Sequence, residues 1–394
     1  MKEILINKKE DSKQILLLED GNLVEKYEEN KNIQRIEGNI YIGKVESVLQ
    51  GMQSAFVDIG QKKNTFIHLK DILPKVDVKD GIQEETKKIK EIVKVGMPLL
   101  VQVKRDFTES KGAKVSTHIS INSRFIVFMP NTTIITISQK IEDEEEKQRL
   151  TQIAKKYLPE NCGVIIRTSA QNQSEENIKQ DIQTAIEKWN NIYMLYEENI
   201  NKNNFPKLIY KSHNVIKKLL IDLVDKDLSR ITVNTDEDYE YLDKSLKEFN
   251  AENIELIKEK TNFLEERPII NSQIEKAEKR KVWLKCGGFI TIDKTEALTA
   301  IDVNSGKYTG RDNVESTIFK VNKEASIEIA KQLKLRDIGG IIIIDYIDMK
   351  REENKDRIIE ILKEELKKDR TKTQIIGFSK LNLLELTRKH ICGS

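Results

Sequence analysis

Cysteine, proline and long apolar runs are scarce in this sequence, and each shortage excludes a class of protein. The three cysteines, Cys162, Cys286 and Cys392, stand alone among 394 residues, and none belongs to a CxxC pair. This usage argues against a disulfide framework and against a cysteine-rich zinc site. Since no segment reaches the roughly 18 apolar residues of a membrane helix, we expect no association with a membrane.

The N-terminus and the overall charge exclude further classes. The opening "MKEILINKKEDSKQ" lacks the apolar core of a secretory signal and mixes acidic with basic residues, so we expect a cytoplasmic protein. The formal net charge is only +2, although 34% of the residues are charged. That balance creates no strong overall field for a polyanion, so nucleic-acid binding would depend on local arrangements of charge.

The chain is too long for one hydrophobic core, and its pattern changes along its length. After an expected strand–turn–strand around Asp20-Gly21, residues 37–125 contain short apolar strands separated by glycines, with a polar insertion at 74–92. This segment resembles the S1 RNA-binding domain, a five-stranded OB-type β-barrel. Such barrels bind single strands by stacking bases on exposed aromatic rings beside cations.

Two phenylalanines are candidates for that stacking. Phe56 and Phe66 lie on the strands that would carry the binding surface, with Lys44, His68 and Lys111 as nearby cations. The pattern alone equally allows both rings to belong to the core of the barrel. The resemblance favours the stacking role.

A second candidate site follows the strand at 163–167. Arg167 and Thr168 end this strand, and the next helix is expected to begin near Ser174. A guanidinium group beside a hydroxyl suits a phosphate monoester. The alternative is a surface ion pair of Arg167. Further on, the carboxylates at 236–238 are expected to start a helix rather than to bind a metal.

Two apolar segments end in aspartates. "EALTAIDV" reaches Asp302 and "IIIIDYIDM" contains Asp345, and the helical pattern between them is expected to end at Gly339-Gly340. Strand, helix, strand makes the two strands parallel, so both aspartates should meet at one edge of the sheet. Two buried carboxylates there would repel each other unless a cation neutralised them.

The donor atoms indicate which metal would bind. Oxygen ligands without nearby Cys or His predict Mg²⁺, with Mn²⁺ as a substitute. Asn304 would lie on the same face as the first aspartate and orient a ligand. Asp348 is expected to point away from Asp345, because strand side chains alternate. In the alternative without a metal, Asp302 caps a turn and Asp345 pairs with Arg336 or Arg311.

Several longer segments resemble the ribonuclease E/G family and occur in the family's order. They are the S1 segment with "AFVDIG", then "IIRTSA", "EALTAIDVNSG", "QLKLRDIGGIIIIDYIDM" and "LLELTRK". The resemblance implies an α/β fold of several subdomains, in which an RNase H-like scaffold with an inserted S1 barrel and 5′-sensor region precedes a DNase I-like α/β catalytic subdomain. The expected boundaries are 1–36 and 205–278 (RNase H-like, structural), 37–125 (S1), 126–204 (5′ sensor) and 279–394 (DNase I-like).

The resemblance also implies an activity. It predicts a Mg²⁺-dependent endoribonuclease that cleaves single-stranded A/U-rich RNA to 5′-phosphate and 3′-hydroxyl ends, prefers 5′-monophosphorylated RNA, and acts in rRNA processing and mRNA decay. The positions carried over are Asp302, Asp345 and Asn304 for metal binding and catalysis, Arg167, Thr168 and Lys372 for the 5′-phosphate, and Phe56, Phe66 and Lys111 for the S1 contacts. The family often has arginine where Lys372 stands, so weaker 5′ sensing is expected.

One departure concerns assembly. Family members continue past "LTRK" into a CPxC zinc-link, whereas this sequence reads "LTRKHICGS", and Cys392 alone cannot form that link. We expect no structural zinc and a homodimer other than the zinc-linked one. Two rival functions remain: a metal-independent ribonuclease with paired histidines, which would leave 2′,3′-cyclic phosphates, and a non-catalytic S1-domain RNA-binding regulator.

Overall fold

The chain forms two compact units. One contains residues 1–34 and 223–392, and the other contains residues 35–222. The computed structural model describes residues 1–30, 35–72, 88–107, 112–224, 228–249, 251–260, 263–306 and 314–391. Among these residues, no helix combines the length and the apolar character that crossing a membrane requires. The sequence-based domain boundaries divide the chain more finely and stay predictions.

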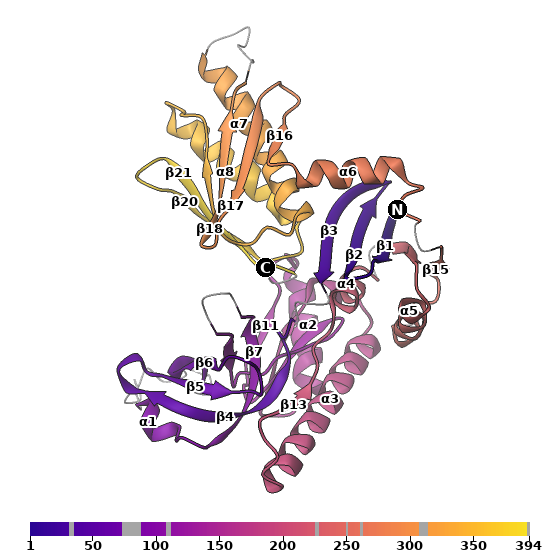
Figure 1. Ribbon diagram of the computed structural model, residues 1–394, viewed down its shortest axis with the longest axis vertical. Coiled ribbons are helices and arrows are strands. Elements are labelled where there is room, and N and C mark those ends of the chain that lie inside the picture. The colour runs from indigo at the N-terminus through magenta and orange to yellow at the C-terminus, as the bar shows by residue number, and fades with distance from the viewer. Residues whose placement is uncertain are drawn as a thin grey trace. The chain divides into compact units, whose positions relative to one another are not determined.

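A five-stranded sheet begins the first unit (Figure 1). Its strands in spatial order are β15 (Glu255–Lys258), β14 (Leu228–Val233), β1 (Lys2–Lys8), β2 (Ser12–Glu19) and β3 (Asn22–Asn30). Positive φ angles of 49° at Asp20 and 77° at Gly21 form the two-residue turn between β2 and β3. The expected strand–turn–strand is therefore confirmed, and β1 lies inside the sheet between β2 and β14.

Two helices accompany this sheet, α5 (Asp236–Glu248) and α6 (Pro268–Glu278). Thr235 caps α5 by accepting a hydrogen bond from the Asp238 amide. The carboxylate of Asp236 forms an ion pair with Lys258, and that of Asp238 one with Lys13 at 2.5 Å. The helix-start role predicted for this acidic cluster is therefore confirmed.

Five strands of the second unit close into a barrel. They are β4 (Ile40–Leu49), β5 (Ser54–Asp58), β6 (Thr65–His68), β8 (Lys114–Ser116) and β7 (Pro98–Arg105). Pairing of β4 with β7 completes the ring, and the short helix α1 (Ile89–Ile92) precedes β7. The barrel has the strand number expected of an OB-type fold. Outside it, β13 (Lys207–Tyr210) pairs with β4.

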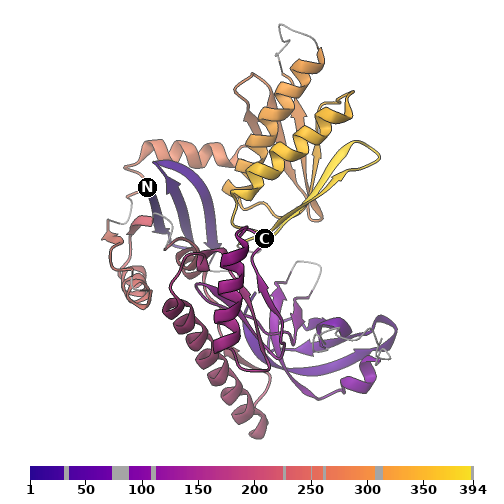
Figure 2. The same cartoon turned by 180° about the vertical axis from the view of Figure 1, so that it is seen from behind.

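A four-stranded sheet and two long helices complete the second unit. Its strands are β11 (Ile135–Ile137), β12 (Cys162–Ile166), β10 (Ile126–Pro130) and β9 (Ile121–Asn122), and its helices are α2 (Glu144–Tyr157) and α3 (Glu175–Asn201). Helices α2 and α3 contact each other (Figure 2). Ser174 caps α3, as predicted, by accepting from the Asn177 amide at 3.2 Å. The helix α4 (Val215–Leu223) follows β13.

The C-terminal part of the first unit is a six-stranded sheet with two helices. The strands in order are β16 (Lys281–Trp283), β17 (Phe289–Lys294), β18 (Leu298–Asn304), β19 (Gly340–Asp345), β21 (Leu383–Arg388) and β20 (Thr373–Phe378). Helices α7 (Val314–Leu335) and α8 (Glu352–Lys367) pack together against the sheet (Figure 1). Strands β18 and β19 are parallel, as the strand–helix–strand order predicted.

The end of α7 differs from the prediction. The helix ends at Leu335, and Asp337 with φ 46° reverses the chain, whereas Gly339 lies beyond the turn and Gly340 begins β19. The prediction that Gly339-Gly340 ends the helix is therefore wrong, and Gly339 meets a steric requirement instead. A Cβ on Gly339 would lie only 2.9 Å from the Arg388 carbonyl oxygen, so this glycine permits close packing against the segment after β21.

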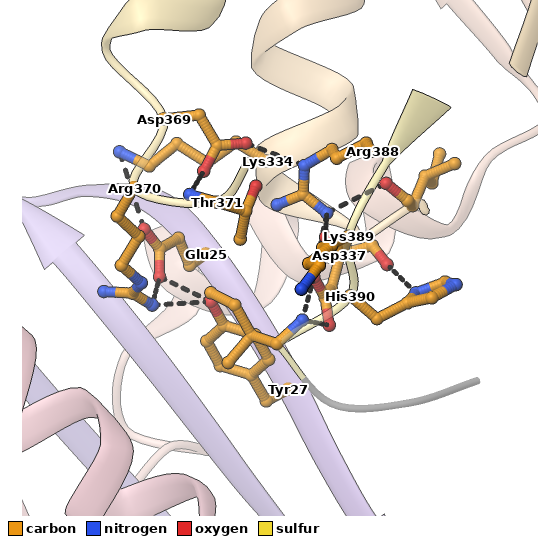
Figure 3. A network of polar contacts seen from close by, with 12 residues as sticks. Glu25, Tyr27, Lys334, Asp337, Asp369, Arg370, Thr371, Arg388, Lys389 and His390 are labelled. Atoms are coloured by element: carbon orange, nitrogen blue, oxygen red, sulfur yellow. Dashed lines mark hydrogen bonds and ion pairs between the residues drawn. The ribbon is translucent and has the colours of Figure 1, made fainter. Parts of the chain in front are cut away.

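Figure 3 shows a buried polar network that joins β3 to the C-terminal sheet within the first unit. Arg370 forms an ion pair with Glu25 of β3, and the Tyr27 hydroxyl donates to the same carboxylate at 2.6 Å. Arg388, whose side chain is fully buried, pairs with Asp369 at 2.7 Å. Burial raises the pKa of Asp369, but the Arg388 guanidinium outweighs it and holds that pKa below its usual value.

Candidate active site

Asp302 and Asp345 are direct partners in the parallel pair of β18 and β19. Paired residues of neighbouring strands project to the same side of a sheet, so both carboxylates share one face. Ile301 and Val303 are buried on the opposite side, in the core that includes α7 and α8. We call the uncovered side the open face; the residues that define it are Lys281, Trp283, Phe289, Asp302 and Asp345.

The expectation that the two carboxylates are buried is wrong, because both side chains are exposed on the open face. The apolar strands suggested burial, but only alternate residues of β18 face the helices. Among the described residues, neither Asp302 nor Asp345 forms an ion pair with a cation. Arg336 donates instead to Gln332 at 2.7 Å, and Arg311 lies outside the described residues.

Negative charge is crowded at this edge of the sheet. Partial burial raises the pKa of Asp345, and the carboxylates of Asp302 and Asp348 raise it further. Strand β19 ends at Asp345, so side-chain alternation does not extend to Asp348, and the prediction that Asp348 points away lacks its premise. The Asn304 amide donates to Asp302 at 2.6 Å and thereby fixes one carboxylate oxygen.

These residues fit a hard divalent cation. Two adjacent carboxylates and an amide supply oxygen donors, and Mg²⁺ commonly binds one or two carboxylates while keeping several waters. No group of three or more His, Cys, Asp or Glu side chains with metal-binding geometry occurs in the described ranges. A site of two carboxylates completed by water and phosphate agrees with that finding better than an all-protein cage.

Asn322 on α7 holds the loop that follows β19, and sequence reasoning missed it. Its fully buried side chain donates to the Ile347 carbonyl at 2.8 Å and accepts from the Ile347 amide at 3.2 Å. The Tyr346 hydroxyl shares a 2.7 Å hydrogen bond with Ser326 on the same helix. The sequence contains one sign of this role, which is a polar asparagine among the apolar residues that form the buried side of the helix.

The barrel carries its own aromatic surface. Phe56 is 37% exposed and Phe66 is half-buried, and the two rings make an edge-to-face contact with centroids 6.2 Å apart. They therefore lie on the outer surface rather than in the barrel core. Lys114 is the direct partner of Phe66 and forms an ion pair with Asp71 at 2.9 Å, so it is a further cation beside the predicted ones.

The other predicted cations of the barrel have distinct positions. Lys44 on β4 is exposed beside Asp58 of β5. His68 ends β6, and its Nδ1 accepts a hydrogen bond from the Lys70 amide at 3.3 Å. Lys111 lies outside the described residues.

Arg167 is engaged by the protein itself. Its guanidinium forms an ion pair with Asp222 and donates to the Ser123 carbonyl at 3.0 Å. Thr168 shares a 2.9 Å hydrogen bond with the Ser138 hydroxyl. The ion-pair interpretation of Arg167 is thus correct, and a phosphate could bind there only by displacing or sharing the contact with Asp222. Lys372 is exposed and belongs to the first unit.

Comparison with known proteins gives a consistent result. A sequence model of the Ribonuclease E/G family matches residues 120–391. Ribonuclease G of Salmonella typhimurium (strain SL1344) is 39% identical over 399 residues, which cover 98% of this chain and 79% of that protein. The putative ribonuclease E of Buchnera aphidicola is 36% identical, with 99% and 95% covered. Ribonuclease E of a Synechocystis strain is 34% identical, with 89% and 52% covered.

Proposed function

The chain belongs to the ribonuclease E/G family, and on that premise we propose that the open face around Asp302 and Asp345 is its catalytic site. The protein is an endoribonuclease, a hydrolase that acts in RNA processing. The observation that supports the site is the direct pairing of Asp302 with Asp345 on parallel strands. The substrates we propose are single-stranded, A/U-rich segments of rRNA precursors and mRNA, cut to 5′-phosphate and 3′-hydroxyl ends.

We propose that Asp302 and Asp345 hold Mg²⁺, or Mn²⁺ in its place. A bound cation there supplies Lewis-acid polarisation of the phosphate and a more acidic water. The chain's own contribution is positional. Asn304 fixes the orientation of Asp302, and Asn322 fixes the loop between Asp345 and Asp348. The rigid pairing of β18 and β19 holds the carboxylates together before substrate binds.

The barrel would hold the RNA strand. Phe56 and Phe66 offer ring faces and edges on the outer surface. Lys44 and Lys114 lie on neighbouring strands, each beside a carboxylate (Glu46 at 4.0 Å and Asp71 at 2.9 Å) with which an RNA phosphate would compete. Base stacking and phosphate attraction together suit a single strand, whose unpaired bases can stack on aromatic side chains. Binding energy gained on the barrel would then help to hold the RNA on the protein during cleavage.

We propose that Arg167 and Thr168 recognise a 5′-monophosphate, and the part expected of Lys372, which belongs to the other unit, stays a prediction. The dianionic phosphate would compete with Asp222 for the Arg167 guanidinium, and the Thr168 hydroxyl would donate to it. A pocket that must first release Asp222 is expected to give a moderate preference rather than an absolute requirement. A cytoplasmic location and a homodimer without shared zinc stay predictions.

The decisive experiment is cleavage of an end-labelled A/U-rich oligoribonucleotide by wild type, Asp302→Asn and Asp345→Asn, with Mg²⁺ or with EDTA. We expect Mg²⁺-dependent cuts with 3′-hydroxyl ends for wild type and at least a 100-fold slower rate for each variant, because each loses a charged donor. Products with 2′,3′-cyclic phosphates would favour the histidine mechanism. Binding without cleavage under every condition would favour the RNA-binding regulator.

A further inference from the structure

An exposed aromatic ring lies on the open face of the C-terminal sheet. It belongs to β16, which is separated by β17 from β18, the strand that carries Asp302. Trp283 on β16 is 64% exposed, although tryptophan normally buries most of its surface. Val282, the preceding residue, packs against the helix-covered core, so Trp283 projects to the opposite side. That side is the one that carries Asp302 and Asp345.

The sheet register places this ring in a defined relation to the site. Trp283 pairs with Phe289 of β17, and Phe289 pairs with Asn304 of β18. Two residues along each strand, on the same face, Lys281, Thr291 and Asp302 form the equivalent row. Neighbouring strands are about 4.8 Å apart, so the indole stands roughly 10 Å across the sheet from Asn304.

Two neighbours brace the indole. The Phe289 ring meets it edge-to-face with centroids 5.4 Å apart, and the Lys281 ammonium lies 4.1 Å from the indole centroid and 3.5 Å from that of Phe289. In the part of the chain that the structure describes, no carboxylate forms an ion pair with Lys281. The cluster thus combines a supported, exposed π-face with a cation that protein acids do not neutralise.

We propose that Trp283, braced by Phe289 and Lys281, is a stacking platform for an unpaired nucleobase next to the scissile phosphate. The inference rests on the proposed function and deepens it, because it assigns a substrate-positioning role on the open face itself. Every base offers a π-face, so the platform is tolerant of sequence but selective for single strands. A base inside a duplex is already stacked and cannot face the indole. Lys281 adds attraction for the RNA backbone.

Kinetics with matched variants provide the first arm of the test. Trp283→Ala should raise KM for a single-stranded oligoribonucleotide roughly tenfold, the loss expected for one base stack, and change kcat little. Trp283→Phe keeps a ring and should recover most of that loss. Ile327→Ala, which truncates a 40% exposed side chain on α7, is the control and should leave KM unchanged. An abasic scan should find one position that weakens cleavage by wild type but not by Trp283→Ala.

Fluorescence provides an arm that needs no catalysis. The sequence has two tryptophans, so Trp189→Phe leaves Trp283 as the sole reporter. In an Asp302→Asn background, titration with uncut oligouridylate should quench that emission, and titration with duplex RNA should not. If RNA quenches the emission but no form of the protein cleaves RNA, the wild type included, the nuclease assignment is refuted and the platform is still supported. Normal cleavage, with no quenching and with a KM that Trp283→Ala leaves unchanged, would refute the platform alone. The platform would also be refuted if Trp283→Ala dissociated a homodimer, because the ring would then serve an interface between two copies of the chain.

Discussion

At the scale of single residues, Asn304 controls how Asp302 is presented. Its amide donates to one carboxylate oxygen at 2.6 Å, so removing it frees that carboxylate to rotate. We expect Asn304→Ala to raise the Mg²⁺ concentration for half-maximal cleavage by about 10- to 100-fold, the range typical of lost supporting contacts at metal sites. Asn122→Ala, at an exposed position of β9, should behave like wild type. A variant that needs no extra Mg²⁺ would contradict this role.

Asn322 gives a second residue-scale prediction. Replacing it by leucine removes both hydrogen bonds to Ile347 and leaves two backbone groups without their partner. We expect a loss of about 2–4 kcal/mol of unfolding free energy, one unsatisfied group costing roughly 1–3 kcal/mol. Denaturant titration measures it. If Asn322→Leu is as stable as wild type, the loop after β19 is held by other contacts.

These residues mark what a sequence can predict about a site. The proximity of Asp302 and Asp345 was predictable, because the order strand, helix, strand makes the two strands parallel and brings their carboxyl ends to the same edge of the sheet. Asn322 was not selected because its partner lies in a loop 25 positions away. Trp283 was not selected because one aromatic residue among lysines gives no sign of which face of a strand it will occupy.

At the scale of elements, the adjacent glycines Gly339 and Gly340 are required for different reasons, and substitutions can distinguish the two. A Cβ at Gly339 would approach the His390 ring to 2.8 Å and the Arg388 carbonyl to 2.9 Å, whereas one at Gly340 would meet nothing but sits at φ 85°. We expect Gly339→Ala to cost about 1–3 kcal/mol through overpacking and Gly340→Ala about 1–2 kcal/mol through backbone strain.

The control for this pair is Gly51→Ala, where a Cβ meets nothing within 4 Å and no positive φ is required. Thermal unfolding of the three variants should show Gly51→Ala unchanged and both others lowered. If Gly339→Ala unfolds like the control, the contact between the β19 entry and the segment after β21 is looser than the structure has it. The helix α7 was predictable from the periodicity of its apolar residues. Its end was not, because the chain reverses at Asp337, a non-glycine residue in the left-handed conformation, which a sequence pattern rarely indicates.

At the scale of the whole molecule, the second unit should be separable. Among the described residues, the hydrophobic cluster of the barrel and the one around α2 and α3 contain only residues from 35–222. We expect a fragment of residues 35–222 to fold and to bind single-stranded RNA with an affinity that falls with salt, but not to cleave it, since both aspartates are absent. An unfolded fragment would show that the division into units does not reflect independent stability.

Acid should weaken the first unit through His390. Burial lowers the pKa of this imidazole below its usual 6.5, although its hydrogen bond to the Asp337 carbonyl opposes the shift. The unfolded state therefore binds more protons below about pH 6.5, so stability is full above that pH and falls as the pH drops toward the folded-state pKa. Melting temperatures between pH 7.5 and 5 should decline less in His390→Gln. Equal declines would assign the effect to other groups.

The place of β1 inside its sheet has a consequence for synthesis on the ribosome. Lys8 bonds to Asn234, 226 positions later, so the N-terminal hairpin emerges with one edge unpaired. At 5–20 residues per second, its partner strand follows roughly 10–45 s afterwards. The barrel unit is complete in the interval and can fold first. The nascent hairpin thus presents an unpaired strand edge, open to aggregation or to a chaperone, until β14 has been synthesised.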